Sequence, residues 1–412
     1  MATKISLSRA KILALATMLL PVSYIIPGVF AYYDEFFVFV CAFFHLTTSR
    51  KRFSRRDRWI FFNIIITYLI GLTSNLQSNL IVSPPPIIID MLTIYKQFLV
   101  FVLLRKVLSE HERQVFVNFL TPISKFYIIL TFILALLSQF IDIGMTFDER
   151  YGIKAFCFVF GNQSAFGISV VACLLIISAS TLPNRKFVLY VVLSFVTLLQ
   201  TTKGVIYSFL TVSFIIFIID NKANIKIRHL VIFAAAIFLI SSYQITTYIT
   251  DYNSPRMHLL LNSFKVANDY APFGSGFATY GGEQAKQHYS PLYVKYGLLY
   301  VYGLGTGHNG KHGNFLNDNY LAMIIAQTGY FGTLIYIVIL FQLFQILNED
   351  KRSSIRYKTI AMAAFAMLVV CSIGTGIIKS TNGVFLFTLL AILPSNENPQ
   401  NIRRHMDDQQ NI

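Results

Sequence analysis

The chain has 412 residues, of which 55% are hydrophobic and 13% are charged, and its formal net charge is +15 at pH 7. Soluble domains carry roughly 25% charged residues, so this composition excludes an ordinary soluble protein and indicates that much of the surface meets lipid. The positive charge is not a sign of nucleic-acid binding, because 23 of the 34 Lys and Arg fall in seven short clusters between uncharged hydrophobic stretches.

These basic clusters predict the topology. Between neighbouring clusters lies enough apolar sequence for two helices of about 20 residues, and Lys and Arg near span ends stay in the cytoplasm. An all-α polytopic membrane protein of about twelve transmembrane helices, with both termini cytoplasmic, places every cluster on the cytoplasmic side. The clusters are Lys4–Lys11, Arg50–Arg58, Arg105–Arg113, Arg185–Lys186, Lys222–Arg228, Lys351–Lys358 and Arg403–Arg404.

The spans are expected in a definite order along the chain. The first follows a basic segment without a small-residue cleavage site, which predicts an uncleaved anchor, kinked at Pro21. The triple proline Pro84–Pro86 predicts a stiff extended outer loop, and Asp142–Lys154 a second outer loop. The predicted spans are Lys11–Phe30, Phe36–Thr48, Trp59–Thr73, Ile87–Leu104, Ile123–Ile143, Ala155–Thr181, Phe187–Leu199, Gly204–Ile219, Leu230–Ile249, Tyr320–Leu347, Thr359–Gly374 and Gly383–Leu393.

This order divides the chain into four parts. Residues 1–249 hold nine spans, 250–317 form one long extracytoplasmic loop, 318–395 hold the last three spans, and 396–412 form a polar cytoplasmic tail. The spacing of the four cysteines fits neither a disulfide framework nor a metal site. The chain also lacks the P-loop, HExxH and GxSxG motifs, so we expect no ATP hydrolysis on this chain and no metal or other cofactor.

The long loop is the place to look for chemistry. Loops of this length tend to be functional or disordered, and this one has too many aromatic residues and too little charge for simple disorder. It begins with Arg256 after Pro255, continues with the glycine-rich segment Pro272–Gly282, and closes with Asn317–Asp318–Asn319 before a helix that carries Gly329–Gly332. Upstream lie Gly161–Ser164 and Gln200–Gly204.

In order and approximate spacing, these motifs resemble the O-antigen and exopolysaccharide polymerase (Wzy-type) family, which is related to the O-antigen ligases and has a GT-C-like fold. The motifs cover roughly the second half of the chain. Two positions depart from the pattern: Asp318 stands nearest the place of the ligases' His, which favours a polymerase over a ligase, and Lys203 replaces an Arg.

The resemblance implies an enzyme that joins oligosaccharide repeat units carried on undecaprenyl diphosphate, at the outer face of the bacterial cytoplasmic membrane. It implies Asp318 as the base for the acceptor hydroxyl, and Arg256 and Lys203 as cations for the diphosphate. Pro272, Gly274, Gly276, Asn317 and Asn319 belong to the loop motif. The expected partners are the lipid-linked oligosaccharide, membrane lipids and a chain-length regulator, with no nucleic acid.

Each residue also has a plainer interpretation. Asn317 or Asp318 would suit a helix N-cap, Arg256 would bind lipid headgroups or pair with Asp251, and Lys203 would snorkel to the interface. The glycine-rich segment would form a tight turn or contact phosphate through its backbone. His308 and His312 are alternative bases, and the loop tyrosines would stack on sugars or anchor at the interface.

Three other functions stay open. A ligase would transfer finished polymer to the lipid A core. A flippase for lipid-linked sugars would fit twelve spans and the intramembrane Lys96, although the chain lacks the symmetry of two halves. A cell-wall glycan polymerase would use an outer acidic residue in a similar way, but the sequence carries no specific motif for it.

Overall fold

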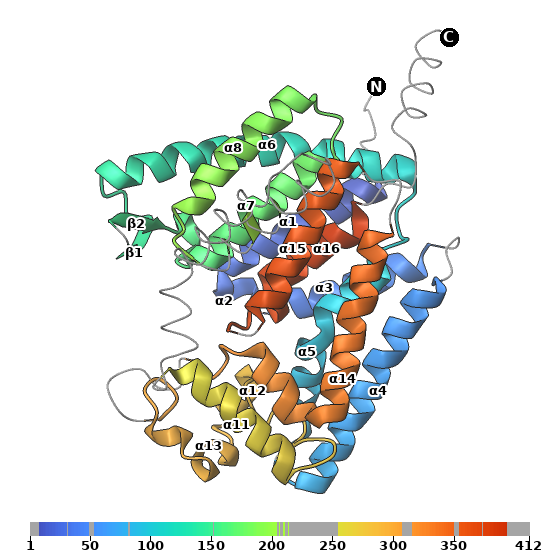
Figure 1. Ribbon diagram of the computed structural model, residues 1–412. Helices are drawn as coiled ribbons and strands as arrows, with labels where there is room; N and C mark the ends of the chain where they lie inside the picture. Colours follow the sequence, from blue (N-terminus) through green and yellow to red (C-terminus); the bar gives the residue numbers. More distant parts are fainter. Residues whose placement is uncertain are drawn as a thin grey trace, which may run out of the picture.

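The computed structural model describes residues 8–30, 32–48, 53–80, 83–150, 152–203, 206, 209–210, 213, 254–306, 315–349, 354–372 and 374–393. Within these residues the protein is mostly helical (Figure 1). The longer helices are α1 (Arg9–Ile25), α3 (Tyr33–Leu46), α4 (Arg55–Ser78), α5 (Pro84–Leu104), α6 (Glu110–Phe140), α7 (Gln163–Ala179), α8 (Asn184–Leu199), α11 (Pro255–Asp269), α14 (Tyr320–Asn348), α15 (Ile355–Cys371) and α16 (Thr381–Ile392). Shorter elements are α2 (Pro27–Phe30), α12 (Glu283–Gln287), α13 (Pro291–Lys295), the 3-10 turns η1 (Phe158–Phe160), η3 (Leu298–Tyr300) and η4 (Ile377–Lys379), and the strands β1 (Thr146–Arg150) and β2 (Ile153–Phe156).

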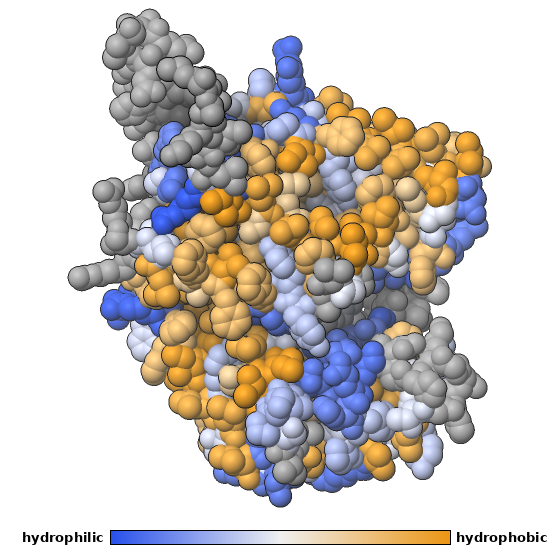
Figure 2. All heavy atoms as spheres, turned by 180° about the vertical axis from the view of Figure 1, so that it is seen from behind, coloured by the Kyte–Doolittle hydropathy of each residue, from blue (hydrophilic) through white to orange (hydrophobic). Residues whose placement is uncertain are grey.

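Four of the described helices, α4, α5, α6 and α14, are long and apolar enough to cross a membrane. Their outer faces are hydrophobic: on α14, Leu334, Ile337 and Phe341 recur at helical spacing and are each more than half exposed. Figure 2 shows hydrophobic residues over a broad part of one face, with hydrophilic residues gathered in its lower part. The prediction of a helical protein embedded in a membrane is thus confirmed at this level.

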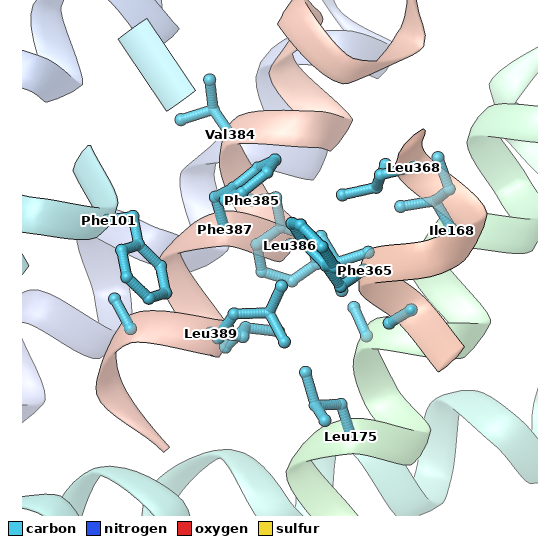
Figure 3. Packing of buried hydrophobic residues seen from close by; sticks show 14 of the residues in the cluster. Phe101, Ile168, Leu175, Phe365, Leu368, Val384, Phe385, Leu386, Phe387 and Leu389 are labelled. Carbon is cyan, nitrogen blue, oxygen red and sulfur yellow. The ribbon is translucent and has the colours of Figure 1, made fainter. Parts of the chain in front are cut away.

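The core is built around α16, a helix whose residues from Asn382 to Ile392 are all buried. Because α5, α7 and α15 surround it (Figure 3), α16 is apolar on every side, as expected for a fully enclosed helix. Phe387 lies at the centre of this cluster, edge-on to Phe98 with ring centroids 5.4 Å apart and edge-on to Phe365 at 6.5 Å.

Most predicted spans within the described residues correspond to one helix each, and the tenth begins at Tyr320 as predicted. The first, Lys11–Phe30, is divided into α1 and α2, with the break at Ile26. The eighth and ninth, Gly204–Ile219 and Leu230–Ile249, lie almost wholly outside the described residues. Some predicted boundaries were wrong. Pro84–Pro86 form the first turn of α5 rather than an extended loop, since proline lacks only an N–H that the first turn leaves unbonded anyway.

Two other predictions need correction near the sixth span. The predicted outer loop Asp142–Lys154 forms most of the antiparallel hairpin of β1 and β2, which continues to Phe156, so the described fold is not purely helical. The predicted start of the span at Ala155 belongs to β2, and α7 begins only at Gln163, where the Asn162 side chain accepts hydrogen bonds from the Ser164 and Ala165 N–H groups. Asn is among the preferred N-cap residues because its short side chain reaches these unbonded donors.

The basic ends of the helices meet one another. Arginines at these ends bind the neighbouring helix end: Arg9 binds Thr47, Arg56 pairs with Glu349, Arg105 pairs with Asp57 at 2.6 Å, and Arg356 donates to the Leu182 carbonyl at 2.7 Å. The start of α4 and the end of α14 therefore lie at one end of the bundle. This basic end is distinct from the opposite end of the same two helices, where the segment 254–306 docks.

That segment was predicted as a loop, but most of it is compact and helical, with α11, α12 and α13 gathered at one end of the bundle (Figure 1). It has a hydrophobic cluster of its own, in which Leu259, Tyr280 and Tyr293 are fully buried. Its glycine-rich part is held between α4 and α14: the Asn75 side chain exchanges two hydrogen bonds of 2.8 Å with the Phe277 backbone.

In this docking, the backbone of Gly274 lies tightly against the kink of α14 at Gly329. A Cβ on Gly274 would collide with the backbone of Ala326 and Gly329, and its φ of +83° is in the left-handed region. At Gly297 φ is also positive, at +71°, but a Cβ there would meet nothing within 4 Å. Gly274 is thus required by both space and backbone conformation.

We predict that Gly274→Ala destabilises the purified protein by about 2–5 kcal/mol, from overpacking and backbone strain together. Gly297→Ala, the matched control, should lose only the smaller backbone contribution of about 1 kcal/mol. Thermal unfolding in detergent measures both. Equal melting temperatures for the two variants would contradict the tight docking of the glycine-rich segment on α14.

Candidate functional site

The strongest candidate site is an ion pair between Arg256 and Asp318. Arg256 lies in the first turn of α11 and Asp318 lies two residues before α14, and the Nη2 and Oδ2 atoms are 2.9 Å apart. Both side chains are partly exposed, at 20% and 31%. Two motifs that are 62 positions apart in sequence thus meet in one place that a ligand can reach.

Asn319 caps the following helix, which leaves Asp318 outside the cap. The Asn319 Oδ1 atom accepts a hydrogen bond from the Ala322 N–H at 3.0 Å, and its Nδ2 atom donates to the Arg256 carbonyl at 3.2 Å. The plainer interpretation of Asn317 or Asp318 as the N-cap was therefore wrong by one or two residues. Asn317 instead faces Glu283, with Nδ2 3.4 Å from the carboxylate.

Further cations surround this carboxylate. Burial raises the pKa of Asp318 above its ordinary value, while the charge and hydrogen bond of Arg256 act in the opposite direction, followed by the charges of Lys286 and Lys203. Lys203 follows α8, Arg256 begins α11 and Asp318 precedes α14. The structure therefore places Arg256 in direct contact with Asp318, whereas Lys203, and Lys286 from α12, act on this carboxylate through their charges.

Arg256 has a second neighbour that orients it. Its guanidinium lies over the Phe315 ring, 6.0 Å from the centroid. The alternative partner Asp251 lies outside the described residues, as do His308 and His312. In the part of the chain that the structure describes, no group of three or more His, Cys, Asp or Glu side chains is arranged to hold a metal ion.

The backbone donors of the glycine-rich segment are already bonded within the protein. The Asp90 Oδ2 atom, from α5, accepts from the Ala278 N–H and from Gln327 Nε2, both at 2.8 Å. Gln327 also donates to the Tyr280 carbonyl at 2.7 Å. Other N–H groups of the segment are occupied in the same way: those of Gly274, Ser275, Gly276, Phe277 and Gly281 each donate to a protein oxygen.

This arrangement favours the tight-turn interpretation of Pro272, Gly274 and Gly276 over backbone contact with phosphate, because the N–H groups that would bind phosphate already have acceptors. The upstream motif is also structural in part. Asn162 caps α7, and Gln163 donates to Asp148 of β1 at 2.8 Å. Tyr280 and Tyr293 are buried in the segment's own core, whereas Tyr300 is 87% exposed.

Sequence reasoning missed four charged residues near the candidate site: Asp90, Lys286, Glu283 and Lys379. The charge of Lys286 acts on Asp318, and the charges of Asp90, Glu283 and Asp318 act on Lys379. Two signals were present. Asp90 is an acidic residue within an apolar span, which is rare without a function or a partner. Lys379 lies between the last two predicted spans, on the side predicted to be extracytoplasmic, where the orientation rule depletes cations. Lys286 and Glu283 carried no comparable signal.

Comparison with known proteins adds no relative. No protein-family model matches the chain, and no curated protein matches it.

Proposed function

We propose that the protein is a polymerase that joins undecaprenyl-diphosphate-linked oligosaccharide repeat units at the outer face of the cytoplasmic membrane. One observation carries the proposal: a carboxylate, Asp318, lies in a partly exposed place with Arg256, Lys203 and Lys286 around it. A base with cations beside it suits an acceptor hydroxyl and an anionic leaving group.

The proposed topology has twelve spans with both termini in the cytoplasm. The contacts among the basic helix ends support it, because Arg and Lys at span ends remain cytoplasmic, and these ends lie away from Asp318. Residues 204–253 would supply the eighth and ninth spans. The segment 254–306 then lies outside the cell membrane, where the lipid-linked repeat units are joined.

In the proposed reaction, Asp318 accepts the proton of an acceptor sugar hydroxyl. The acceptor oxygen forms a bond to the anomeric carbon of the donor chain, and the bond from that carbon to the diphosphate oxygen breaks. The electron pair leaves with undecaprenyl diphosphate, whose developing charge is stabilised by Arg256 and Lys203. Arginine suits this role because its guanidinium binds two phosphate oxygens at once.

The ion pair itself has a role in this scheme. While the donor is absent, Arg256 neutralises Asp318 and stabilises its ionised form. When a diphosphate binds Arg256, the guanidinium is shared with the phosphate oxygens, and the carboxylate is left more basic beside the acceptor. The nearby Phe315 ring limits the positions that the guanidinium adopts.

We predict that Asp318→Asn lowers polymerisation by roughly 10²- to 10⁴-fold, the usual contribution of a general base, and that Arg256→Gln causes a comparable loss. Lys295→Gln is the control, because Lys295 lies in the same segment but pairs with Asp269 in solvent. The measurement is the length distribution of lipid-linked glycan in cells that carry each variant.

The phenotype of a deletion strain separates the alternatives. A polymerase predicts the loss of long chains, with single repeat units retained on the outer leaflet. Long carrier-linked chains that stay unattached would indicate a ligase instead, and repeat units trapped on the inner leaflet would indicate a flippase. Unchanged long chains in both site variants would remove Asp318 and Arg256 from the mechanism.

The ion pair also predicts a pH dependence. A base works only when it is deprotonated, so activity should rise with pH as Asp318 loses its proton. Arg256 and Lys286 hold the pKa of Asp318 down against burial. Removing either charge should therefore raise that pKa and move the acid limb of the pH–rate profile to higher pH, more in Arg256→Gln than in Lys286→Gln.

Rates of a purified protein in proteoliposomes, measured from acid to neutral pH, check this order. Lys295→Gln should leave the acid limb in place. An acid limb that moves to lower pH in Lys286→Gln would mean that the titrating group is not Asp318.

A further inference from the structure

Lys379 is a buried cation close to the proposed site that the scheme above does not use. It ends the turn η4 between α15 and α16, and the residue is only 4% exposed. Among the described residues, its ammonium has two contacts: the Gly281 carbonyl at 3.4 Å and the Met323 sulfur at 2.9 Å. Neither is a carboxylate.

These contacts are weak for a buried ammonium. A lysine ammonium has three donors, and burying a charge is costly unless it is paired and hydrogen-bonded. A thioether is a weak acceptor, and 3.4 Å is beyond the usual range of an N–H···O bond. The Asp90 oxygen that bonds the glycine-rich segment already accepts two hydrogen bonds at 2.8 Å.

Lys96 shows what a structural buried lysine looks like in the same protein. Its ammonium lies 2.6 Å from Asp34 and 2.6 Å from Glu35, at the start of α3. Lys96 and Lys379 are almost equally buried, at 3% and 4%. One has two carboxylates in direct contact, and the other has none among the described residues, so a role in holding the fold explains Lys96 but not Lys379.

The turn that carries Lys379 packs against Asn317, the residue before Asp318. Gly376, on the same turn, lies against the Asn317 carbonyl, and the Asn317 Oδ1 atom is buried without a hydrogen-bond partner among the described residues. Asp318 is the next residue and acts electrostatically on Lys379, together with Asp90 and Glu283. The under-bonded ammonium and the open amide oxygen thus lie beside the proposed base.

Lys379 remains a cation at neutral pH. Burial lowers its pKa to about 8, while Asp90 acts in the opposite direction, and the other charges nearby are Lys96, Glu283 and Asp318. At pH 7 the protonated form therefore predominates.

From these contacts we infer that Lys379 is a further substrate-binding residue, whose ammonium takes an oxygen of the prenyl-linked diphosphate as its missing acceptor. The inference rests on the proposed function, because it concerns the donor of that same reaction. Lys379 would be a third cation for the diphosphate, holding it from the η4 side, in addition to Arg256 at the start of α11 and Lys203 after α8. No bond beyond those of the proposed transfer forms or breaks.

The test uses the full-length protein in detergent, with geranylgeranyl diphosphate as the probe and geranylgeraniol as its uncharged counterpart. Lys379→Met is examined alone and together with Asp90→Asn, since the double variant removes the acid that acts most strongly on Lys379 along with the cation. Asp90→Asn alone is the reference, because an amide oxygen can still accept from Ala278 and Gln327. Lys379→Arg tests whether a cation alone suffices.

We expect the double variant to melt at about the temperature of Asp90→Asn, since replacing buried charges with apolar or neutral groups is often neutral or stabilising. It should bind the diphosphate on the order of tenfold to a hundredfold more weakly, the effect of one lost charge-assisted hydrogen bond, and bind geranylgeraniol unchanged. Lys379→Arg should retain part of the diphosphate affinity. Lys96→Met should instead lower the melting temperature, because it leaves two carboxylates without their cation.

Equal diphosphate affinity in the double variant and in Asp90→Asn would overturn the inference, and so would a wild-type protein that binds the diphosphate no better than the alcohol. Polymerisation assays distinguish a failure of the inference about Lys379 from a failure of the proposed function. If the wild-type protein and the double variant polymerise equally well, the inference about Lys379 is refuted and the proposed function is not. A wild-type protein that binds the diphosphate through Lys379 but makes no polymer supports the inference and refutes the proposed function.

Discussion

The structure depends on one constraint: a polar group among apolar helices must have a partner, because the surroundings offer none. The docking of residues 254–306 follows from it. Asp90, Asn75 and Gln327 are polar residues within apolar helices, and each bonds the backbone of the glycine-rich segment. The same hydrogen bonds give partners to the polar groups of the helices and of the segment, so an irregular stretch of chain is fixed between α4, α5 and α14.

The same constraint explains how the charged side chains are paired at the two ends of the bundle. At one end, arginines pair with acids or carbonyls of neighbouring helix ends, as Arg105 does with Asp57. At the other end, Arg256 pairs with Asp318, and both side chains stay partly exposed. Lys379 departs from the rule, since it is as buried as Lys96 but lacks a direct acid partner among the described residues. Buried charges without a direct partner of opposite charge are concentrated at functional sites, where a bound ligand supplies that partner.

Much of the helical layout could be predicted because apolar length and basic clusters are local features of the sequence. The start of α14 at Tyr320 followed from the polar run before it. The roles of Arg256, Lys203 and Asp318 rested on family resemblance and are still proposals, although Arg256 and Asp318 do form an ion pair. Pro84–Pro86 and the β1–β2 hairpin were mispredicted because proline fits both extended chain and a first helical turn, and because short strands have little periodicity. Asp90 and Lys379 were missed because their meaning lies in contacts between distant segments, such as that of Asp90 with Gln327, 237 positions away.

The central claim is that the Asp318 end of the bundle faces away from the cytosol, and labelling of single cysteines tests it most directly. In a variant without the four native cysteines, Tyr300→Cys would mark the site end and His111→Cys the basic end, since Tyr300 is 87% exposed and His111 lies at the start of α6. A membrane-impermeant maleimide applied to intact spheroplasts should label position 300, and should label position 111 only after permeabilisation. Labelling of position 111 alone in intact spheroplasts would contradict the account, because the proposed site would then face the cytosol.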